Sequence, residues 1–520
     1  MGFDRKRFVL PLVELASLLI VVTIVAACGT TASSTTGQIH RGGNLTIARN
    51  EDILSLDPTA ISDNASIWSS EQIYETLYTL TPDGKSLTPE LATRYTVSPD
   101  KLIWTFYLRP GAKFSDGSPL TATDVAFSMN RARRSTAGLG YIDGAIKSVT
   151  APDATTVVVR AQHPWAPMLS DVALFVNGVM PANFGGKSAA QFFQNPVGSG
   201  PFMFASWTKG ASLKLARNPN YWQTGRPYLD SVTYTNVPED ATRSLQMQGG
   251  QVQIDALPAW SFISAFKAMP SVQVKLYQSS RVDLLLLNEH AAPYQDVHVR
   301  RAISYAINRA NLVTALLFGN GQAANSYLPP SIPYYDASLP TPQYDLAKAR
   351  QEMAASSVPH GFTTTFLTDN LAVDMEEAQI VQQQLRPLGI TVKIRTVDAD
   401  QEWTVQGKGD YQITLEYWSM DIPDPDESTE FFLSPAGGGN SYFTYYNSPT
   451  MTRLVAASAA AFDPTKRAAI YDQIQTLDMQ DLPQIPVYFS PWDYVVSTKV
   501  HNFSVYSLGS QDLKDTWLAN

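Results

Sequence analysis

Residues 104–117 read WTFYLRPGAKFSDG, and this run carries the clearest local pattern in the chain. From Trp104 onward every second side chain is large and apolar, which predicts a strand with one buried face. Arg109 and Asp116 are expected to form an ion pair under the turn that follows. Gly117 stands where such a turn needs a positive φ angle. The run therefore predicts a strand that ends in a tight, glycine-dependent turn.

Other strands and helices are expected on both sides of this run. Alternating apolar residues predict strands at 45–47, 157–159, 390–394 and 485–489. Helical spacing of apolar residues is found at 67–80, 296–318 and 374–388. Gly389 follows the last of these helices and is expected to end it. This mixture, joined by irregular Pro-rich loops, indicates an α/β protein of several domains.

Composition limits the possible classes of function. The chain has 520 residues, which suggests roughly three domains of about 150 residues each. Hydrophobic residues make up 44% and charged residues 16%, so a large core can form. The net charge is -9 and no long run of Lys or Arg occurs, so a nucleic acid is not expected as a partner.

The N-terminal segment has the features of an export signal. Residues 5–7 are basic, and the apolar stretch at 15–27 is shorter than the ~20 residues that cross a bilayer. We expect 1–27 to be a cleaved signal peptide, with a retained membrane anchor as the alternative. Residues 28–43 are rich in Thr, Ser and Gly, which predicts a flexible tether.

Cys28 is the single cysteine of the chain, which excludes an internal disulfide. Its position directly after Val25-Ala26-Ala27 resembles the lipid-attachment site of bacterial lipoproteins. The resemblance implies a lipid on Cys28 and anchoring to the outer face of the cell membrane. That location is the periplasm if the envelope has an outer membrane.

Six blocks of sequence, taken in order, resemble the oligopeptide/dipeptide/nickel-binding family (family 5) of solute-binding proteins of ABC importers. They are RGGNL with LDP (41–45, 56–58), YETLY with PELA (74–78, 89–92), the run at 104–117, PVGSGPF (196–202), RNPNYW (217–222) and VRRAISYAINR (299–309). In PVGSGPF, Gly200 is expected to need a positive φ angle.

The resemblance implies an α/β, two-lobed fold of the periplasmic-binding-protein type (class II, cluster C) with an inserted domain. Lobe I would contain 44–80, 200–290 and 490–520, the inserted domain II would contain 81–199, and lobe III would contain 291–489. The hinge strands would lie near 282–288 and 487–496, and closure about them would enclose the ligand. The resemblance also implies a monomer that works with ABC permease and ATPase subunits.

The resemblance further implies a ligand site at residues 416–426. In peptide-binding members a Trp-x-x-Asp pattern supplies the aspartate that holds the ligand's α-ammonium, and Trp418 and Asp421 match it. A charge-assisted hydrogen bond of this kind is worth roughly 1.5–3 kcal/mol. Some members carry an arginine three residues before the tryptophan, where this chain has Leu415. The other expected ligand-binding residues are Tyr417, Asn440, Ser62 and Asn64.

Two other readings of this segment remain open. Asp421, Asp424 and Asp426 would also suit a solvated acidic turn shaped by the prolines between them. A calcium-binding loop is the second alternative, although the spacing departs from the usual pattern of such loops.

Other ligands and a different function class also remain open. Aromatic residues make up 11% of the chain and would suit an oligosaccharide, whereas a nickel or other metal chelate is disfavoured by six dispersed histidines. A secreted hydrolase is the remote alternative. The sequence contains no HExxH, P-loop or G-x-S-x-G motif. We therefore expect a binding protein with no catalytic residues, no cofactor and no metal.

Overall fold

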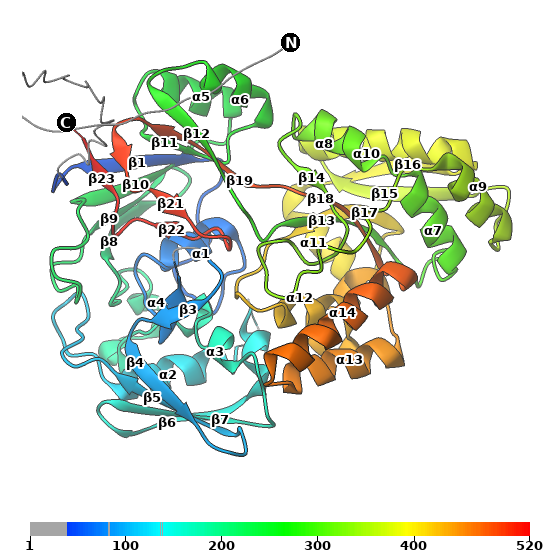
Figure 1. Ribbon diagram of the computed structural model, residues 1–520. Coiled ribbons are helices and arrows are strands. Elements are labelled where there is room, and N and C mark those ends of the chain that lie inside the picture. Colours follow the sequence, from blue (N-terminus) through cyan, green and yellow to red (C-terminus); the bar gives the residue numbers. More distant parts are fainter. Residues whose placement is uncertain (1–38, 82–83, 136, 138, 520) are drawn as a thin grey trace, which may run out of the picture. The chain divides into compact units, whose positions relative to one another are not determined.

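Three β-sheets organise the computed structural model, which describes residues 39–81, 84–135, 137 and 139–519. The seven-stranded sheet, which we call lobe I, has the order β12-β19-β11-β1-β10-β9-β8, with β1 parallel to β10 and β11. Its strands are β1 (Asn44–Arg49), β8 (Phe202–Thr208), β9 (Ser212–Arg217), β10 (Ser231–Asn236), β11 (Ile254–Ala256), β12 (Val272–Tyr277) and β19 (Trp492–Ser497). Its helices are α1 (Asn64–Ser70), α5 (Asp240–Gln248) and α6 (Trp260–Lys267) (Figure 1).

The four-stranded antiparallel sheet, which we call domain II, has the order β4-β5-β7-β6. Its strands are β4 (Ala92–Val97), β5 (Ile103–Leu108), β6 (Ile146–Asp153) and β7 (Thr156–Ala161). Its helices are α2 (Ala122–Ala132), α3 (Met168–Asp171) and α4 (Ala189–Phe192). Three small hairpins pair β2 (Tyr78–Leu80) with β3 (Leu87–Pro89), β20 (Val500–His501) with β23 (Trp517–Leu518), and β21 (Ser504–Val505) with β22 (Gln511–Asp512).

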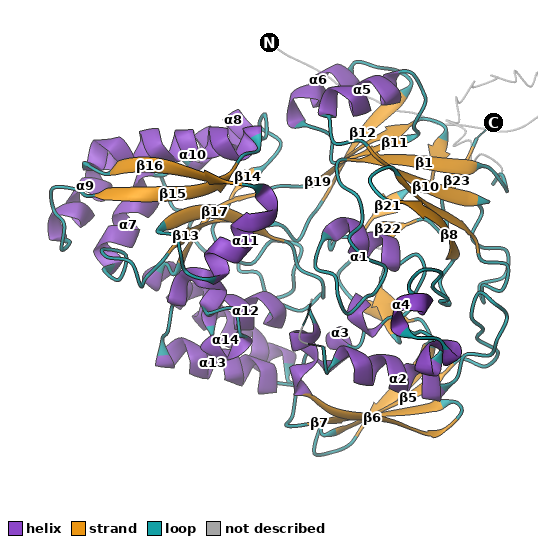
Figure 2. Cartoon of the chain, turned by 180° about the vertical axis from the view of Figure 1, so that it is seen from behind, coloured by secondary structure: helices purple, strands orange, loops and turns teal. Residues whose placement is uncertain are grey.

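The six-stranded mixed sheet, which we call lobe III, has the order β14-β18-β13-β17-β15-β16. Its strands are β13 (Val282–Leu287), β14 (Gln322–Ala323), β15 (Thr363–Asp369), β16 (Thr391–Val397), β17 (Ile413–Trp418) and β18 (Gln484–Phe489). Helices surround it (Figure 2): α7 (Val297–Ala306), α8 (Arg309–Leu316), α9 (Leu346–Ala355), α10 (Ala372–Leu385), α11 (Ala399–Gly407), α12 (Asp426–Leu433), α13 (Pro449–Ala460) and α14 (Pro464–Asp481).

Two short segments connect lobe I to lobe III. Residues 278–281 join β12 to β13, and residues 490–491 join β18 to β19. The Ser279 hydroxyl donates a hydrogen bond to the carbonyl of Ser490, which ties the two crossings together. If one lobe rotates relative to the other, the backbone of these two connecting segments must therefore change conformation. The predicted residue boundaries of the domains and the hinge stay a prediction.

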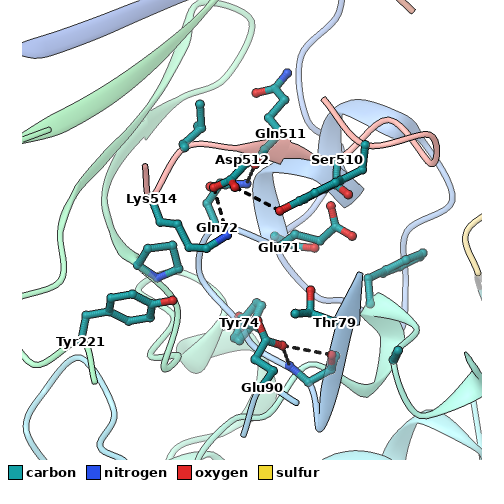
Figure 3. A pocket seen from close by; sticks show the side chains of 17 residues that line it. Glu71, Gln72, Tyr74, Thr79, Glu90, Tyr221, Ser510, Gln511, Asp512 and Lys514 are labelled. Atoms are coloured by element: carbon teal, nitrogen blue, oxygen red, sulfur yellow. Dashed lines mark hydrogen bonds and ion pairs between the residues drawn. The ribbon is translucent and has the colours of Figure 1, made fainter. Parts of the chain in front are cut away.

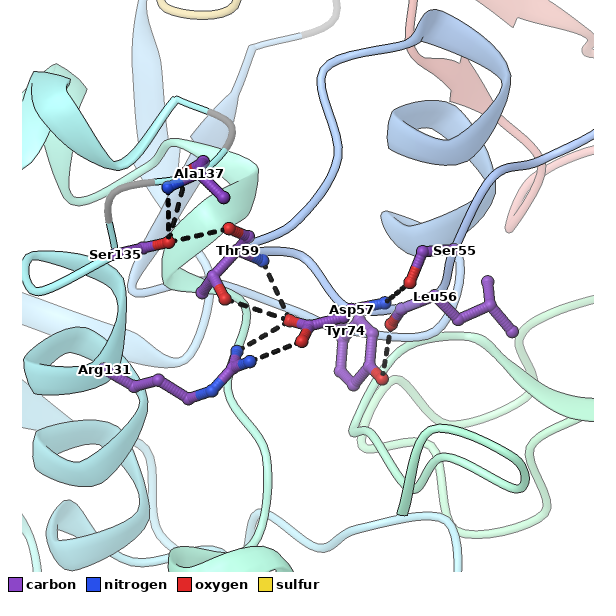
Figure 4. Close-up of polar contacts among 8 residues, drawn as sticks. All are labelled: Ser55, Leu56, Asp57, Thr59, Tyr74, Arg131, Ser135 and Ala137. Carbon is purple, nitrogen blue, oxygen red and sulfur yellow. Dashed lines mark hydrogen bonds and ion pairs between the residues drawn. The ribbon is translucent and has the colours of Figure 1, made fainter. Parts of the chain in front are cut away.

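Domain II is tied to lobe I by a polar cluster around Asp57 (Figure 4). The guanidinium of Arg131 on α2 forms a bidentate ion pair with Asp57, with Nη1 2.7 Å from Oδ1. The backbone N–H of Thr59 donates to the same carboxylate at 3.0 Å. The Leu56-Asp57-Pro58 block therefore anchors a loop of lobe I to the helix of domain II.

Several local predictions are confirmed. The strand expected from Trp104 onward is β5, and its alternate side chains are buried. Gly117 has a φ angle of 89°. The helix expected at 374–388 is α10 with a 3-10 turn, and it ends at Gly389, whose φ angle is 76°.

Other local predictions are wrong. Arg109 does not pair with Asp116, because its Nε donates to the Glu90 carbonyl and its guanidinium lies 3.2 Å from the Trp222 ring centroid. Gly200 has no positive φ angle and is required instead because a Cβ would lie 2.5 Å from the Gln72 carbonyl oxygen.

Two of the expected helices are also shorter than predicted. The one at 296–318 is divided into α7 and α8, because the Asn308 side chain caps a new N-terminus. The one at 67–80 is replaced by α1 and β2, and α1 is capped by Asp63.

Lipidation of Cys28 and cleavage at 1–27 concern residues outside the described part of the chain. Within the described residues, no helix combines the length and the apolar character that crossing a bilayer requires.

Candidate functional site: the cleft between the two large sheets

The carboxyl ends of β1 in lobe I and of β17 in lobe III lie close to each other, and we call the space between them the cleft. β1 ends at Arg49 and continues into Glu51, while β17 ends at Trp418. Burial raises the pKa of Tyr417 to about 12, and the Glu51 carboxylate adds to the rise while Arg281 opposes it. A carboxylate of lobe I therefore lies near an aromatic side chain of lobe III. Ligands of open α/β sheets bind beyond such carboxyl ends.

Lobe I contributes Arg49, Glu51 and Asp63 to the cleft. Arg49 lies 4.6 Å from the Tyr234 ring centroid and donates to the Ser69 hydroxyl at 3.0 Å. Burial raises the pKa of Glu51, and nearby Asp63 raises it further. Asp63 Oδ1 accepts from the Ser66 backbone N–H at 2.8 Å, whereas its buried Oδ2 has no hydrogen-bond partner in the described part of the chain. A small cavity adjoins Arg49 and Glu51.

Ser62 and Asn64, two of the predicted ligand-binding residues, lie on either side of Asp63 at the start of α1. Ser62 is exposed and Asn64 is half-buried. Sequence reasoning missed the acid between them, although a Ser/Asp/Asn cluster before an apolar helix is a typical cap signal. A role for Ser62 and Asn64 in binding stays a prediction.

In lobe III, Tyr417 lies near the carboxyl end of β17 and is partly exposed, whereas the next residue, Trp418, is buried. Tyr417 is 43% exposed, and the Arg281 guanidinium lies 4.0 Å from its ring centroid. Arg281 also holds Asp283 through two hydrogen bonds of 2.7 and 3.1 Å. Trp418 is 9% exposed and packs on Phe431 at a centroid distance of 4.8 Å. Tyr417 thus faces the cleft, whereas Trp418 supports the turn that follows.

That turn is held by the buried carboxylate of Glu427. It accepts the indole N–H of Trp418 at 3.1 Å and the backbone N–H groups of Asp421 and Ile422 at 2.8 and 3.0 Å. Burial raises the pKa of Glu427 to about 7. With the Trp-x-x-Asp spacing, the Glu427 carboxylate can therefore accept hydrogen bonds from both ends of the turn, which fixes the backbone position of Asp421.

The Asp421 carboxylate itself has no hydrogen-bond donor among the described residues and is half-buried. Burial raises its pKa well above the ordinary value, and the carboxylates of Glu427 and, from lobe I, Glu71 raise it further. Three acids from two lobes therefore converge without a cation between them. The site has the electrostatics of a binding site for an ammonium group.

Glu71, one of these three acids, also lines a cavity of about 90 Å³ (Figure 3). The cavity is also lined by Glu90, Tyr221, Asp512 and Lys514. Burial raises the pKa of Glu71 to about 8 and that of Glu90 to about 7. The cavity is polar, and its walls come from α1, from the hairpin of β2 and β3, and from the C-terminal segment.

The solvated acidic turn, one of the alternatives for 416–426, is wrong. Asp424 and Asp426 are 7% and 4% exposed, and Asp424 forms a bidentate pair with Arg467 at 2.7 and 2.8 Å. Because Arg467 already neutralises Asp424, the calcium-loop alternative also loses a ligand. Among the described residues, no group of three or more His, Cys, Asp or Glu side chains is arranged to hold a metal ion.

Asn440 is exposed, its φ angle is 45°, and its side chain forms no hydrogen bond with a described residue. The turn that it begins is linked to β17, because the Tyr442 hydroxyl donates to the Tyr417 carbonyl at 3.3 Å. A ligand contact by Asn440 stays a prediction.

The most informative residues that sequence reasoning missed are Glu51, Asp63, Glu71, Arg281 and Glu427. They are brought together from segments far apart in the chain: the end of β1, the two ends of α1, the crossing before β13 and the first turn of α12. Only Asp63 had a local signal, its position before the helix. Nothing in the sequence near the other four marks them as neighbours.

Comparisons with known proteins agree with this architecture. The family profile described as "Bacterial extracellular solute-binding proteins, family 5 Middle" matches residues 86–440. The probable D,D-dipeptide-binding periplasmic protein DdpA of Escherichia coli is 31% identical over 88% of this chain and 91% of its own length. The glutathione-binding protein GsiB of Shigella flexneri is 27% identical over 91% of this chain and 92% of its own.

A solved structure agrees as well. The periplasmic binding protein DppA of Helicobacter pylori, in complex with the peptide STSA, superposes with a TM-score of 0.83 at 25% identity. The superposition covers 92% of this chain and 99% of that one. The chain therefore belongs to the bacterial extracellular solute-binding proteins of family 5, which bind a solute outside the cytoplasm and are not enzymes.

Proposed function

We propose that the protein captures a peptide in the cleft between lobe I and lobe III and delivers it to an ABC importer. The observation that carries the proposal is the Asp421 carboxylate, which has no donor among the described residues and is flanked by Glu427 and Glu71. Every unmodified peptide has an N-terminal ammonium, so one such carboxylate recognises peptides whatever their side chains. The remainder of the peptide would be held through its main chain, as in strand addition.

The relatives support a peptide ligand, since their names include a D,D-dipeptide-binding protein and a glutathione-binding protein. On this proposal the protein acts with the permease and ATPase subunits of an importer and works as a monomer. A lipid on Cys28 would keep it at the outer face of the membrane. Mass spectrometry of the protein isolated from membranes tests the lipid directly, because the N-terminal peptide would carry the added mass of a glycerol and its acyl chains.

Binding of matched peptides to cargo-free protein tests the role of Asp421. Tetra-alanine is compared with N-acetyl-tetra-alanine by isothermal titration calorimetry. We expect acetylation to weaken binding by roughly tenfold to a hundredfold, because it removes the charge-assisted hydrogen bond. Asp421→Asn should lower the affinity for tetra-alanine by a similar factor and abolish the difference between the two peptides.

The matched control is Asp472→Asn, because Asp472 is an exposed acid on α14. It should bind both peptides as the wild type does. Equal affinity of the wild type for the two peptides would contradict the role given to Asp421. Binding of an oligosaccharide in place of both peptides would contradict the peptide ligand while leaving the transport class intact.

A further inference from the structure

The edge of the lobe III sheet that faces the cleft is strongly acidic. Its carboxyl groups are Asp283, Asp369, Asp374, Glu377, Glu402 and Glu416, which come from β13, β15, α10, α11 and β17. They form one electrostatic group, since Asp374 is influenced by Asp369 and Glu416, and Glu402 by Glu416, Asp369 and Asp374. The parallel strands β15 and β17 end here, at the position where open α/β sheets bind ligands.

These acids have too few cationic partners. Arg281 is the basic side chain that acts on them, and it is already paired bidentately with Asp283. Glu377 is 5% exposed, and one of its oxygens accepts from the Tyr488 hydroxyl at 2.8 Å. The other oxygen has no hydrogen-bond partner among the described residues. A buried carboxylate in this state is stabilised when a cation or donor reaches it.

At the same edge, the side-chain oxygen of Gln406 is buried and has no partner among the described residues. Gln406 is fully buried and donates through Nε2 to Glu416 at 2.5 Å and to Thr414 at 3.4 Å. The Oε1 atom of Gln406 accepts no hydrogen bond from any residue that the structure describes. Gln406 therefore orients Glu416 and leaves an additional acceptor beside it, which suits a donor with several N–H groups.

Two aromatic rings lie open beside these acceptors. Trp403, adjacent to Glu402 on α11, is 48% exposed, and Tyr417, adjacent to Glu416 on β17, is 43% exposed. Trp403 stacks on Trp418 at a centroid distance of 6.3 Å, on the face of β17 opposite to Tyr417, so the two exposed rings flank the end of this strand. Aromatic faces next to carboxylates favour organic cations through cation–π contacts.

We infer that this edge, which we call the acidic edge, binds a second cationic group of the ligand: an ammonium or guanidinium carried on a side chain. The inference rests on the proposed function, because Asp421 is assigned to the α-ammonium and the acidic edge to a different group. It identifies the ligand class as basic peptides. Neutral peptides would bind through Asp421 alone and leave the acidic edge uncompensated.

Calorimetry with matched peptides tests this inference. The probes are tetra-alanine peptides in which one residue, at the second, third or fourth position, is replaced by lysine or by norleucine of nearly the same shape. At one position we expect the lysine peptide to bind at least about tenfold more tightly than its norleucine counterpart. The double variant Asp374→Asn with Glu402→Gln should reduce that ratio below about threefold and leave the affinity for tetra-alanine unchanged.

Glu376→Gln is the matched control, because Glu376 is exposed on α10 one residue before Glu377. It should retain the preference for lysine. Equal affinity for lysine and norleucine peptides at all three positions would overturn the inference while leaving the proposed function standing. A third outcome is that no peptide binds but 1,5-diaminopentane does, and that the diamine binds more weakly to the double variant. In that case the proposed peptide ligand is wrong, whereas the cation-binding role of the acidic edge is supported. Failure of the peptides and the diamine to bind would overturn both.

Discussion

At the scale of single residues, the cleft is defined by carboxylates that the protein does not neutralise. Asp421, Glu427 and Glu71 converge from two lobes, and Glu51 lies close to Asp63. By contrast, Asp424, in the same turn as Asp421, and Asp57, in lobe I, each have an arginine partner. Asp424 and Asp57 are therefore neutralised by arginines, whereas the Asp421 carboxylate has no cationic partner among the described residues. That difference is the physical reason to assign the unpaired acids to a cationic ligand.

The unpaired acids should make the free energy of unfolding depend on pH, because their pKa values differ between the folded and the unfolded protein. Burial raises the pKa of Glu71 from 4.5 to about 8, so between these values the folded protein holds a proton that the unfolded chain releases. The stability of the ligand-free protein is then greatest below the lower value and falls as the pH rises through the upper one. Glu71→Gln should make the free energy of unfolding less dependent on pH by roughly 1–3 kcal/mol over this interval. Urea titrations at both ends of the interval, with Glu376→Gln as control, would measure it.

For an acid that is paired with an arginine, removal of its charge should lower the stability of the protein. Asp57→Asn removes the charge that Arg131 faces, where the two side chains are 15% and 22% exposed. We expect the free energy of unfolding to fall by about 1–3 kcal/mol, because a partly buried guanidinium loses its carboxylate. Chemical denaturation would measure the loss, with the exposed Asp472→Asn as reference. A loss no larger than that of the reference would show that the pair does not hold domain II to lobe I.

At the scale of elements, close backbone contact explains the block PVGSGPF. The N–H of Gly200 donates to the Ile73 carbonyl at 2.8 Å, and the N–H of Phe202 donates to the Gln72 carbonyl at 3.0 Å. A Cβ on Gly198 would lie 2.0 Å from the Ile73 carbonyl oxygen. Ser199, between the two glycines, is 1% exposed, which does not suit a nucleophile. The block therefore has a structural role: it packs the backbone of domain II directly against the backbone of lobe I.

Gly198→Ala should therefore be strongly destabilising, by about 3 kcal/mol, since the backbone of Ile73 has to move to make room for the methyl group. Thermal unfolding and urea titration would measure this. Gly144→Ala is the matched control, because no heavy atom lies within 4 Å of its added Cβ. If the two variants lose the same stability, the close approach is not what requires the glycine.

The elements also show what the sequence could predict. The strand from Trp104 and the helix ending at Gly389 were predictable, because their periodicity and end signals are local. The single long helix at 296–318 was not, because the capping side chain of Asn308 outweighs a continuous apolar stripe. Tyr417, Trp418 and Asp421 could be proposed from a resemblance. Glu71 and Arg281 could not, because tertiary structure alone brings them to Asp421 and Tyr417.

At the scale of the whole molecule, the two lobes share contacts beyond the crossing segments. Ile422, in the turn that carries Asp421, is 1% exposed and belongs to the hydrophobic core of lobe I. The Ser280 hydroxyl, at one crossing, accepts from the Met420 backbone N–H at 3.0 Å. The turn that holds Asp421 is therefore fastened to lobe I on one side and to the crossing on the other. Ligand binding and lobe closure should be coupled through this turn.

Truncation of Ile422 tests the coupling. Ile422→Ala should weaken peptide binding by roughly tenfold, because it removes an apolar contact that closure requires. Calorimetry with tetra-alanine would measure the affinity, and small-angle scattering would show whether the peptide still reduces the radius of gyration. Unchanged affinity together with lowered thermal stability would mean that the contact serves folding alone.

Identification of the bound cargo tests the claim that the cleft holds a peptide by its α-ammonium. The soluble form that begins after Cys28 is purified without denaturation and then unfolded, and the released small molecules are identified by mass spectrometry. We predict a mixture of peptides with free N-termini from the wild type and from Asp472→Asn, and none from Asp421→Asn. An oligosaccharide or a metal chelate in place of peptides, or the same peptides from Asp421→Asn, would contradict the claim.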